Sequence, residues 1–162
     1  MRLCEENITL TGKAAALELL SIAHHEDLVE AVQDGDLHKL WYTNIPSACE
    51  MRAEISRRLE LHRQGSMYPF ALKHLATQRC VGMTTYMNIE PSQRRLEIGS
   101  TWLRKSIQRS AVNTECKFLL LEYAFEHLNC ICVEFRTHTM NLQSRRRLSA
   151  SAPSRMGCCA TI

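Results

Sequence analysis

Leu96-Glu97-Ile98-Gly99-Ser100-Thr101-Trp102-Leu103 opens the stretch that decides the fold, which runs on to Leu128. Its alternation of apolar and polar side chains predicts a strand, with Leu96, Ile98 and Trp102 in the same environment. A polar, basic segment follows over residues 104–113. Residues 114–128 then carry apolar side chains at helical spacing, namely Phe118, Leu121, Ala124, Phe125 and Leu128. The stretch therefore predicts a strand, a loop and a helix.

The start of the predicted helix has the features of an anion-binding site. Asn113 or Thr114 is a suitable N-cap, and Glu115 falls in the first turn, where the helix dipole favours an acidic side chain. Backbone N–H groups at a helix N-terminus point outward and bind anions. Positive charge is added by three side chains of the loop, Arg104, Lys105 and Arg109.

The chain before this stretch predicts one strand, two helices and two further strands. The first strand is expected over residues 13–20 and the first helix over residues 21–33. Ser47 begins a second helix that ends near Gly65, with Glu50 at the capping-box position. The two further strands are expected over residues 68–75 and 79–89, joined by a tight turn.

A last predicted strand, over residues 130–137, follows the central helix. A strand–helix–strand connection of this kind places the two strands parallel and side by side. The order of elements predicts one α/β domain with a mixed, largely antiparallel sheet flanked by helices.

The segment Gln108-Arg109-Ser110-Ala111-Val112-Asn113 resembles the acyl-CoA loop of GNAT-family N-acetyltransferases, whose pattern is Gln/Arg-x-x-Gly-x-Gly/Ala. Ala111 and Asn113 stand where glycines are usual. The strand Leu96-Glu97-Ile98-Gly99, the strand ending at His138 and the motif Asn141-x-x-Ser144 are similar to the RimJ/RimL-type branch of that family. That branch acetylates amino groups of proteins or small molecules. The resemblance covers residues 8–146.

The resemblance implies an enzyme that transfers an acetyl group from acetyl-CoA to a primary amine of a protein N-terminus or a small molecule. It implies contacts with acetyl-CoA from residues of the loop and of the later motif, namely Gln108, Arg109, Ser110, Ala111, Val112, Asn113, Thr114 and Asn141. It also implies that Ser144 lies near the leaving thiolate as a catalytic residue. Without the resemblance, Asn141 is an ordinary helix N-cap.

Acetyl transfer to an amine needs a group that takes a proton from the nitrogen and a group that polarises the thioester. Glu97 is the candidate base, because it faces opposite to Leu96 and Ile98 on the strand that flanks the loop. The structural alternative for Glu97 is an ion pair with Arg94 or Arg95.

Three further side chains have both a functional and a structural interpretation. His138 is a candidate for proton transfer, because the ordinary pKa of a histidine suits that role. The structural interpretation of His138 is a histidine in a solvated loop. Trp41 and Tyr42 are candidates for the wall of the acceptor site, and they are equally suited to the core.

After Arg146 the sequence departs from the family. The family typically continues A-I-E-R-L-G-A-K-x-D-G-V-L-R, whereas residues 147–162 have no amphipathic period and predict coil. One choice of codons for residues 147–162 encodes, when read two bases later, I-E-R-L-G-A-K-Q-D-G-V-L-R-N-H. We therefore expect residues 1–146 to form an incomplete GNAT-like domain that lacks the usual C-terminal strands. The tail is then the product of a one-base frameshift, and acceptor binding and turnover are impaired.

Composition and charge are those of a soluble globular protein, with 162 residues and a net charge of +3. This charge does not by itself indicate a nucleic-acid partner. No apolar stretch approaches the ~20 residues that span a membrane, and no apolar signal core begins the chain, so we expect a cytoplasmic protein. The eight cysteines have no metal-ligand spacing. No metal cofactor is expected.

Two alternatives belong to other functional classes. A non-catalytic module could bind CoA or another anion at residues 108–113 without transferring an acetyl group. A basic nucleic-acid-associated protein could use the loop cations and the run of arginines over residues 145–147, although no aromatic platform accompanies that run. The acetyltransferase interpretation alone explains the strand at Leu96, the loop and Asn141-x-x-Ser144 together.

Overall fold

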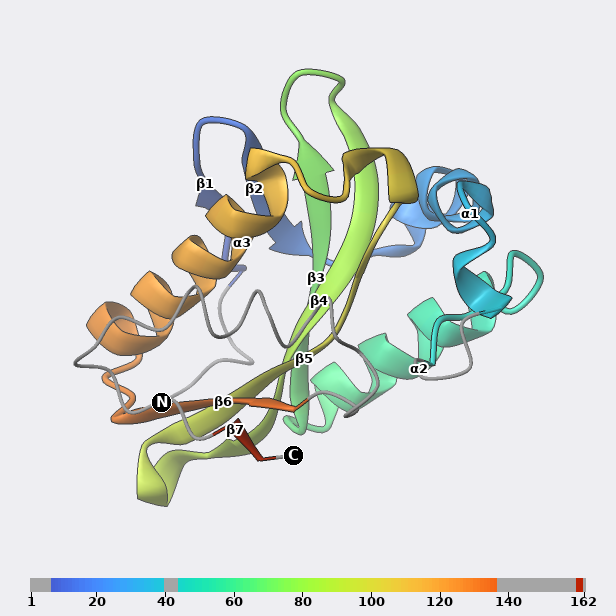
Figure 1. Ribbon diagram of the computed structural model, residues 1–162. Helices are drawn as coiled ribbons and strands as arrows, with labels where there is room; N and C mark the ends of the chain where they lie inside the picture. Colours follow the sequence, from blue (N-terminus) through green and yellow to red (C-terminus); the bar gives the residue numbers. More distant parts are fainter. Residues whose placement is uncertain (1–6, 40–43, 137–159, 162) are drawn as a thin grey trace.

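A computed structural model of the protein describes residues 7–39, 44–136 and 160–161. Seven strands form one sheet in the order β1 to β7 (Figure 1). Neighbours from β1 to β5 are antiparallel, whereas β6 is parallel to β5 and β7 is parallel to β6. The predicted mixed, largely antiparallel sheet is confirmed. Its strands are Leu10–Thr11 (β1), Ala15–Leu19 (β2), Met67–His74 (β3), Arg79–Glu90 (β4), Arg95–Leu103 (β5), Cys132–Arg136 (β6) and Ala160–Thr161 (β7).

Helices cover both faces of this sheet. The helices α1 (His25–Gln33) and α2 (Met51–Arg63) lie on one face, and α3 (Ala111–Glu122) lies on the other (Figure 1). α3 continues as a π-helical turn over Tyr123–His127 (η6). Short 3₁₀ turns join the longer elements, namely Ile22–His24 (η2), Leu37–Lys39 (η3), Pro91–Gln93 (η4) and Lys105–Ile107 (η5). No helix in the described part of the chain is long and apolar enough to cross a membrane.

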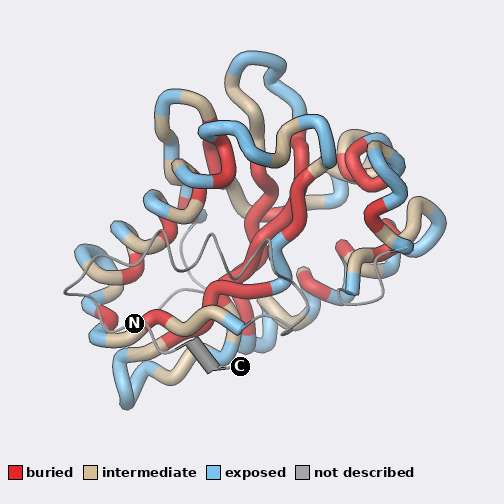
Figure 2. Tube along the Cα trace, in the orientation of Figure 1, coloured by how far each residue is buried: buried red, intermediate tan, exposed pale blue. Residues whose placement is uncertain are grey.

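Two apolar clusters hold these layers together, and buried residues follow the central strands (Figure 2). Leu96 and Ile98 of β5 pack in the cluster beneath α3. Trp102 packs instead in the cluster beneath α1 and α2. The prediction that Trp102 shares the environment of Leu96 and Ile98 is therefore wrong. The cause is a β-bulge at Ser100, which has a φ of 50° and reverses the alternation of faces along β5.

The central helix begins earlier than its sequence indicated. Ser110 is the N-cap, and its Oγ accepts a hydrogen bond from the N–H of Val112 at 3.3 Å. The prediction of Asn113 or Thr114 as N-cap is wrong, and Glu115 consequently lies beyond the first turn. The early start moves the acyl-CoA motif from a loop into the first turn of a helix.

The buried stripe of α3 also differs from the predicted one. Phe118 is 61% exposed. The side chains that pack on the sheet are spaced four residues apart and are mostly small, namely Val112, Cys116, Leu120 and Ala124. Of the predicted residues, Ala124 is buried and Leu121, Phe125 and Leu128 pack partly buried against the same cluster, so the prediction is wrong for Phe118.

The second helix begins one turn later than predicted. Glu50 Oε2 accepts hydrogen bonds from the N–H and the hydroxyl of Ser47 at 3.0 and 2.6 Å. This pair closes a turn that precedes α2, and the helix itself starts at Met51.

The strand β7 lies within the segment for which the sequence predicted coil. It pairs with β6 through Phe135↔Ala160 and Arg136↔Thr161. The coil prediction is therefore wrong at these two positions, and one strand follows β6 in a sheet that was expected to lack C-terminal strands. The remainder of that tail lies outside the described residues.

One carboxylate ties the turn between β1 and β2 to α3. Glu115 accepts hydrogen bonds from the backbone N–H groups of Lys13, Ala14 and Ala15 at 2.7, 2.7 and 2.8 Å. These bonds, that from Lys13 foremost, lower the pKa of Glu115. A side chain at Gly12 would displace the same carboxylate, because a Cβ there would lie 2.4 Å from its carbon. The β1–β2 turn thus holds the N-terminal half of α3 against the sheet.

Glu115→Gln should destabilise the protein at about pH 7, because the amide presents an NH₂ group to three N–H donors. We expect a loss of about 1–2 kcal/mol in the free energy of unfolding, reduced by partial solvent exposure. A carboxyl whose pKa is lowered by folding stabilises the protein above its unfolded pKa of about 4.3, and this contribution disappears as the pH falls through its folded-state pKa. Urea unfolding should therefore show a smaller difference between the two proteins at about pH 3.

The matched control is Glu122→Gln, an exposed carboxylate on the same helix with no contact to a described residue. An equal loss in the control, or a loss for Glu115→Gln that does not depend on pH, would contradict the role of the three hydrogen bonds.

Candidate active site

The pairing of β5 with β6 stops partway along β5. In the described part of β6, the strands pair at the positions Arg95↔Cys132, Leu96↔Val133 and Glu97↔Glu134. β5 continues to Leu103. From residue 98 onward, β4 is the only strand that pairs with β5 among the described residues. The bulge at Ser100 falls in this unpaired part, and bulges beside active sites commonly re-aim side chains. In the part of the chain that the structure describes, the two strands therefore part directly after Glu97, and one edge of β5 beyond this point has no strand partner.

Glu97 lies at this point of parting and is 5% exposed. Because Leu96 and Ile98 pack beneath α3, the alternation of β5 directs Glu97 to the face covered by α1 and α2, as predicted. Its Oε2 accepts a hydrogen bond from Asn88 Nδ2 at 2.7 Å and lies 3.3 Å from Arg136 Nε.

The other carboxylate oxygen, Oε1, has no hydrogen bond to a described residue. A Cβ on Gly99 would lie 3.2 Å from this oxygen and 2.8 Å from Met87 Sδ. Glycine at position 99 therefore leaves room for the carboxylate of Glu97. The result is a buried acid with one oxygen held and the other available.

The ion pairs predicted for Glu97 are not formed. Arg94 Nε donates to the backbone oxygen of Asn129 at 2.7 Å, and Arg95 Nη2 pairs with Glu90 at 2.7 Å. Asn88 and Arg136 take their place. The sequence contained only a weak indication that Asn88 has a special role. Asparagine is typical of turns, yet Asn88 stands within an otherwise apolar strand.

The first turn of α3 contains three residues of the predicted anion site, Ala111, Val112 and Asn113. Helix geometry leaves the N–H groups of Ala111, Val112 and Asn113 without acceptors in the helix. Ser110 Oγ satisfies Val112, and the N–H groups of Ala111 and Asn113 remain for a ligand. No acidic side chain lies in this turn to oppose an anion. The helix start therefore has the geometry and polarity of a phosphate-binding site.

Individual motif residues have different parts in this site. Gln108 Nε2 donates to the oxygen of Leu103 at 2.9 Å, so its amide braces the loop against the end of β5. Arg109 is exposed, has a φ of 66° and forms no ion pair with a described residue. Val112 is buried in the core and can contribute its backbone alone, whereas Thr114 is exposed.

Asn113 is 7% exposed, and its carboxamide forms no hydrogen bond within the described ranges. A ligand at the helix start could form a hydrogen bond with this amide. The glycine of the family pattern is therefore replaced by a side chain with its own hydrogen-bonding capacity.

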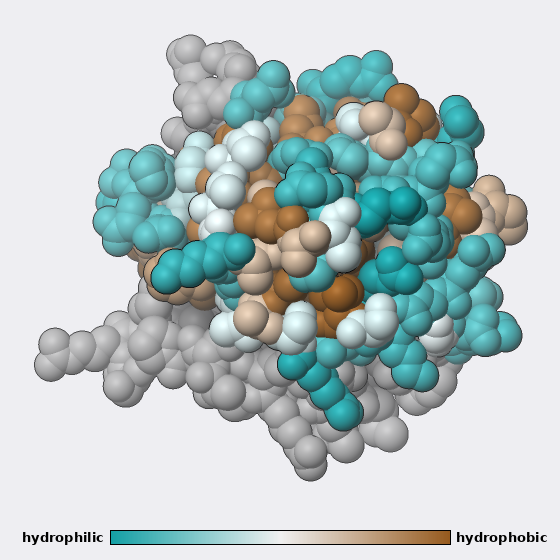
Figure 3. Space-filling view, turned by 90° about the horizontal axis from the view of Figure 1, so that it is seen from above, coloured by the Kyte–Doolittle hydropathy of each residue, from teal (hydrophilic) through white to brown (hydrophobic). Residues whose placement is uncertain are grey.

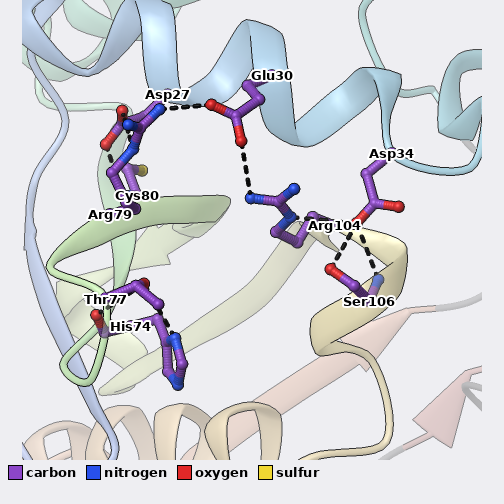
Figure 4. A network of polar contacts seen from close by, with 9 residues as sticks. All are labelled: Asp27, Glu30, Asp34, His74, Thr77, Arg79, Cys80, Arg104 and Ser106. Atoms are coloured by element: carbon purple, nitrogen blue, oxygen red, sulfur yellow. Dashed lines mark hydrogen bonds and ion pairs between the residues drawn. The ribbon is translucent and has the colours of Figure 1, made fainter.

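Arg104 was expected to add positive charge at the start of α3, but its guanidinium pairs with two acidic side chains instead. Its Nε donates to Asp34 Oδ2 at 3.1 Å and its Nη1 to Glu30 Oε1 at 3.3 Å (Figure 4). The hydroxyl and N–H of Ser106 also donate to Asp34, at 2.6 and 3.0 Å. These bonds, that of the Ser106 hydroxyl foremost, lower the pKa of Asp34. The end of α1 thereby fixes η5, the turn that leads into the motif.

Arg58 is a further candidate functional residue, and it was not predicted from the sequence. It is 2% exposed, and its Nε and Nη1 donate to Glu54 Oε1 and Thr85 Oγ1 at 2.7 and 2.8 Å. Thr85 pairs with Gly99, beside the carboxylate of Glu97. Burial lowers the pKa of Arg58, and Glu54 supplies the compensating charge. The polar sequence of α2 gave no sign that one arginine points inward.

Glu54 also lines an open hollow of about 300 Å³. The other lining residues are Asn44, Pro46, Glu50, Ala53 and Arg57. Two hydrogen bonds of Arg58, to Glu54 and to Thr85, link the lining of this hollow to the strand β4.

The molecular surface around the start of α3 is mainly hydrophilic, with small apolar clusters near its centre (Figure 3). Figure 1 places the start of α3 and the turn between β3 and β4 on this side. Among the described residues, no group of three or more His, Cys, Asp or Glu side chains could hold a metal ion. Burial raises the pKa values of Cys80 and Cys116 to about 12, which suits core thiols rather than nucleophiles.

Several predicted site residues lie outside the described part of the chain. They are Asn141 and Ser144 of the predicted site, together with Trp41, Tyr42 and His138. Among the described site residues, Glu97 lies on β5, and the start of α3 follows the end of the same strand after a short connection.

Comparison with known proteins agrees with this geometry. The family model of the acetyltransferase (GNAT) domain matches residues 16–150. A solved GCN5-related N-acetyltransferase from Brucella melitensis is 26% identical, with a TM-score of 0.74 over 89% of this chain and 66% of that chain. None of the curated proteins matches this chain.

Two solved ribosomal-protein acetyltransferases share the fold at lower identity. RimL, a ribosomal L7/L12 alpha-N-protein acetyltransferase, is 17% identical, with a TM-score of 0.72 over 90% of this chain and 80% of that chain. The ribosomal-protein-S5-alanine acetyltransferase from Vibrio fischeri is 12% identical, with a TM-score of 0.71 over 90% and 82%. The match to the family model covers most of the chain, and the chain belongs to the GNAT family of acyl-CoA-dependent N-acetyltransferases.

Proposed function

We propose that this chain transfers the acetyl group of acetyl-CoA to the primary amine of a protein N-terminus or a small molecule, with Glu97 as the general base. The observation that carries the proposal is a buried carboxylate with one available oxygen, at the point where β5 and β6 part. The start of α3, which has the features of an anion site, follows from the end of the same strand.

The start of α3 fits the phosphates of acetyl-CoA. The N–H groups of Ala111 and Asn113 would bind phosphate oxygens, and Arg109 would add charge from its exposed position. The amide of Asn113 would gain a partner on binding. We propose contacts from Asn141 and a role for Ser144 in protonating the leaving thiolate on the resemblance alone.

Acetyl-CoA supplies the acetyl group as an activated thioester. In the proposed reaction, Glu97 Oε1 takes a proton from the amine, directly or through water, and frees its lone pair to attack the carbonyl carbon. Backbone N–H groups on the unpaired edge of β5 can donate to the carbonyl oxygen as negative charge develops there. The C–N bond forms and the C–S bond breaks, the thiolate receives a proton from Ser144, and the Ser144 oxygen regains a proton from the attacking nitrogen, which thereby becomes the neutral amide.

The acceptor side of the proposal rests on the face that α1 and α2 cover. Glu97 and the hollow beside Glu54 share this face. The fold shared with two ribosomal-protein acetyltransferases favours a RimJ/RimL-type acceptor, and peptides with a free N-terminal alanine or serine are the first to test. A cytoplasmic location stays a prediction of the sequence.

Glu97→Gln should reduce turnover by about 10²- to 10⁴-fold, the range that general bases contribute. Acetyl-CoA affinity should stay unchanged, because the start of α3 is untouched. Mass spectrometry of the acetylated peptide and calorimetric titration with acetyl-CoA check the two parts. Unchanged turnover would contradict the assignment of the base, and binding without any turnover in the wild-type chain would favour a non-catalytic CoA-binding module.

Arg109→Gly should weaken acetyl-CoA binding without straining the chain, because φ at this position is 66° and suits glycine. The loss of one charge-assisted contact predicts about a 10-fold increase in the dissociation constant at low salt. The matched control is Arg94→Gly, another arginine with positive φ, at 51°. Equal affinities for the Arg109→Gly variant and the wild type would contradict a role of Arg109 in binding.

We also propose that the sequence after Arg146 is read in a shifted frame and that this impairs the enzyme. A chain with the frame restored should be more stable and should bind acetyl-CoA at least as well. Ligand at about 100 times its dissociation constant adds roughly 2.7 kcal/mol, which is a shift of about 5–11 °C in melting temperature at this size.

Thermal titration of both chains with acetyl-CoA separates the outcomes. A shift in the restored chain alone supports impairment, and equal shifts with equal turnover contradict it. Absence of a shift in either chain would contradict the acetyl-CoA site.

A further inference from the structure

We infer that Asn88 is a positioning residue for Glu97, an assignment that rests on the proposed role of Glu97 as the base. Two groups contact Glu97 Oε2: Asn88 Nδ2 at 2.7 Å and Arg136 Nε at 3.3 Å. Asn88 and Arg136 are both exposed, and the contact of Arg136 is the longer one. A hydrogen bond of 2.7 Å to a carboxylate is in the strong, charge-assisted range. Asn88 therefore provides the main restraint on the carboxylate.

The restraint acts on one oxygen and leaves the other available. With Oε2 held by Asn88, Oε1 lies over Gly99, where the absence of a Cβ gives it room. A carboxylate without this anchor would rotate about its terminal torsion, which is broad. The anchor thus selects the orientation in which Oε1 can reach a proton on the acceptor.

The backbone at position 88 does not itself require asparagine. Asn88 has a φ of 47° and lies where the register between β4 and β5 shifts, between Met87↔Glu97 and Glu90↔Arg95. Glycine would adopt this left-handed conformation with no steric cost. What asparagine adds is the amide, and the amide's partner is Glu97.

The other charged groups nearby neutralise one another. Glu134, the β6 partner of Glu97, lies 3.5 Å from Arg95 Nη1 and 3.3 Å from Arg136 Nη2. Arg95 also pairs with Glu90. Asn88 is the neutral donor in this group, so its loss changes the orientation of Glu97 without changing the net charge.

Asn88→Gly removes the amide and keeps the backbone unstrained. We expect turnover of peptides with a free N-terminal alanine or serine to fall by about 10- to 100-fold, the effect of misplacing a catalytic group. The KM for acetyl-CoA and the melting temperature should not change. Asn88→Asp, which replaces the donor by a second carboxylate, should lose turnover to a similar extent.

The matched control is Asn129→Gly, because Asn129 is also left-handed, with a φ of 54°, and its side chain forms no hydrogen bond with a described residue. This variant should keep wild-type turnover. A crystal structure of Asn88→Gly should show the carboxylate of Glu97 displaced.

The outcomes for Asn88 and for the proposed function are distinguishable. If Glu97→Gln is inactive while Asn88→Gly turns over like the wild type, or if Glu97 is unmoved in the variant crystal, the positioning role is overturned and the proposed base stands. If Glu97→Gln turns over normally, or if the wild-type chain acetylates none of these peptides, the proposed function fails and the inference about Asn88 fails with it.

Discussion

The structure depends on the parting of two parallel strands, since β5 is paired with β6 as far as Glu97 and then continues along β4. Two irregularities accompany this change, the bulge at Ser100 and the register shift at Asn88. Both residues are left-handed, which costs of order 1 kcal/mol for a residue other than glycine. The long antiparallel pairing of β3, β4 and β5 sustains these two positions, because neighbouring ladder hydrogen bonds hold the backbone in place.

The start of α3 is held by elements that are distant in sequence. Glu115 joins the helix to the β1–β2 turn, and Asp34 at the end of α1 holds η5 through Arg104 and Ser106. Together these contacts fix the first turn of α3 at the end of β5. The N–H groups of this turn are thereby oriented before any ligand binds, which reduces the entropy lost on binding.

Buried charge in the site is compensated by neighbouring side chains. Arg58 is matched by Glu54, and Glu97 is anchored through one oxygen by Asn88 with Arg136 nearby. A buried ion without a partner is strongly unfavourable. A carboxylate with one satisfied oxygen and one available oxygen keeps most of this compensation while it remains able to accept a proton.

The sequence by itself determined the order of most elements, the mixed sheet and the parallel β5–β6 pair. These follow from local periodicity and from residue types, which act over a few positions. The tertiary structure decided where α3 begins, which face Trp102 takes, that Arg104 is neutralised by α1, and that Asn88 and Arg136 contact Glu97. These features depend on positive φ values, strand register and contacts between remote residues, and none of them leaves a period in the sequence.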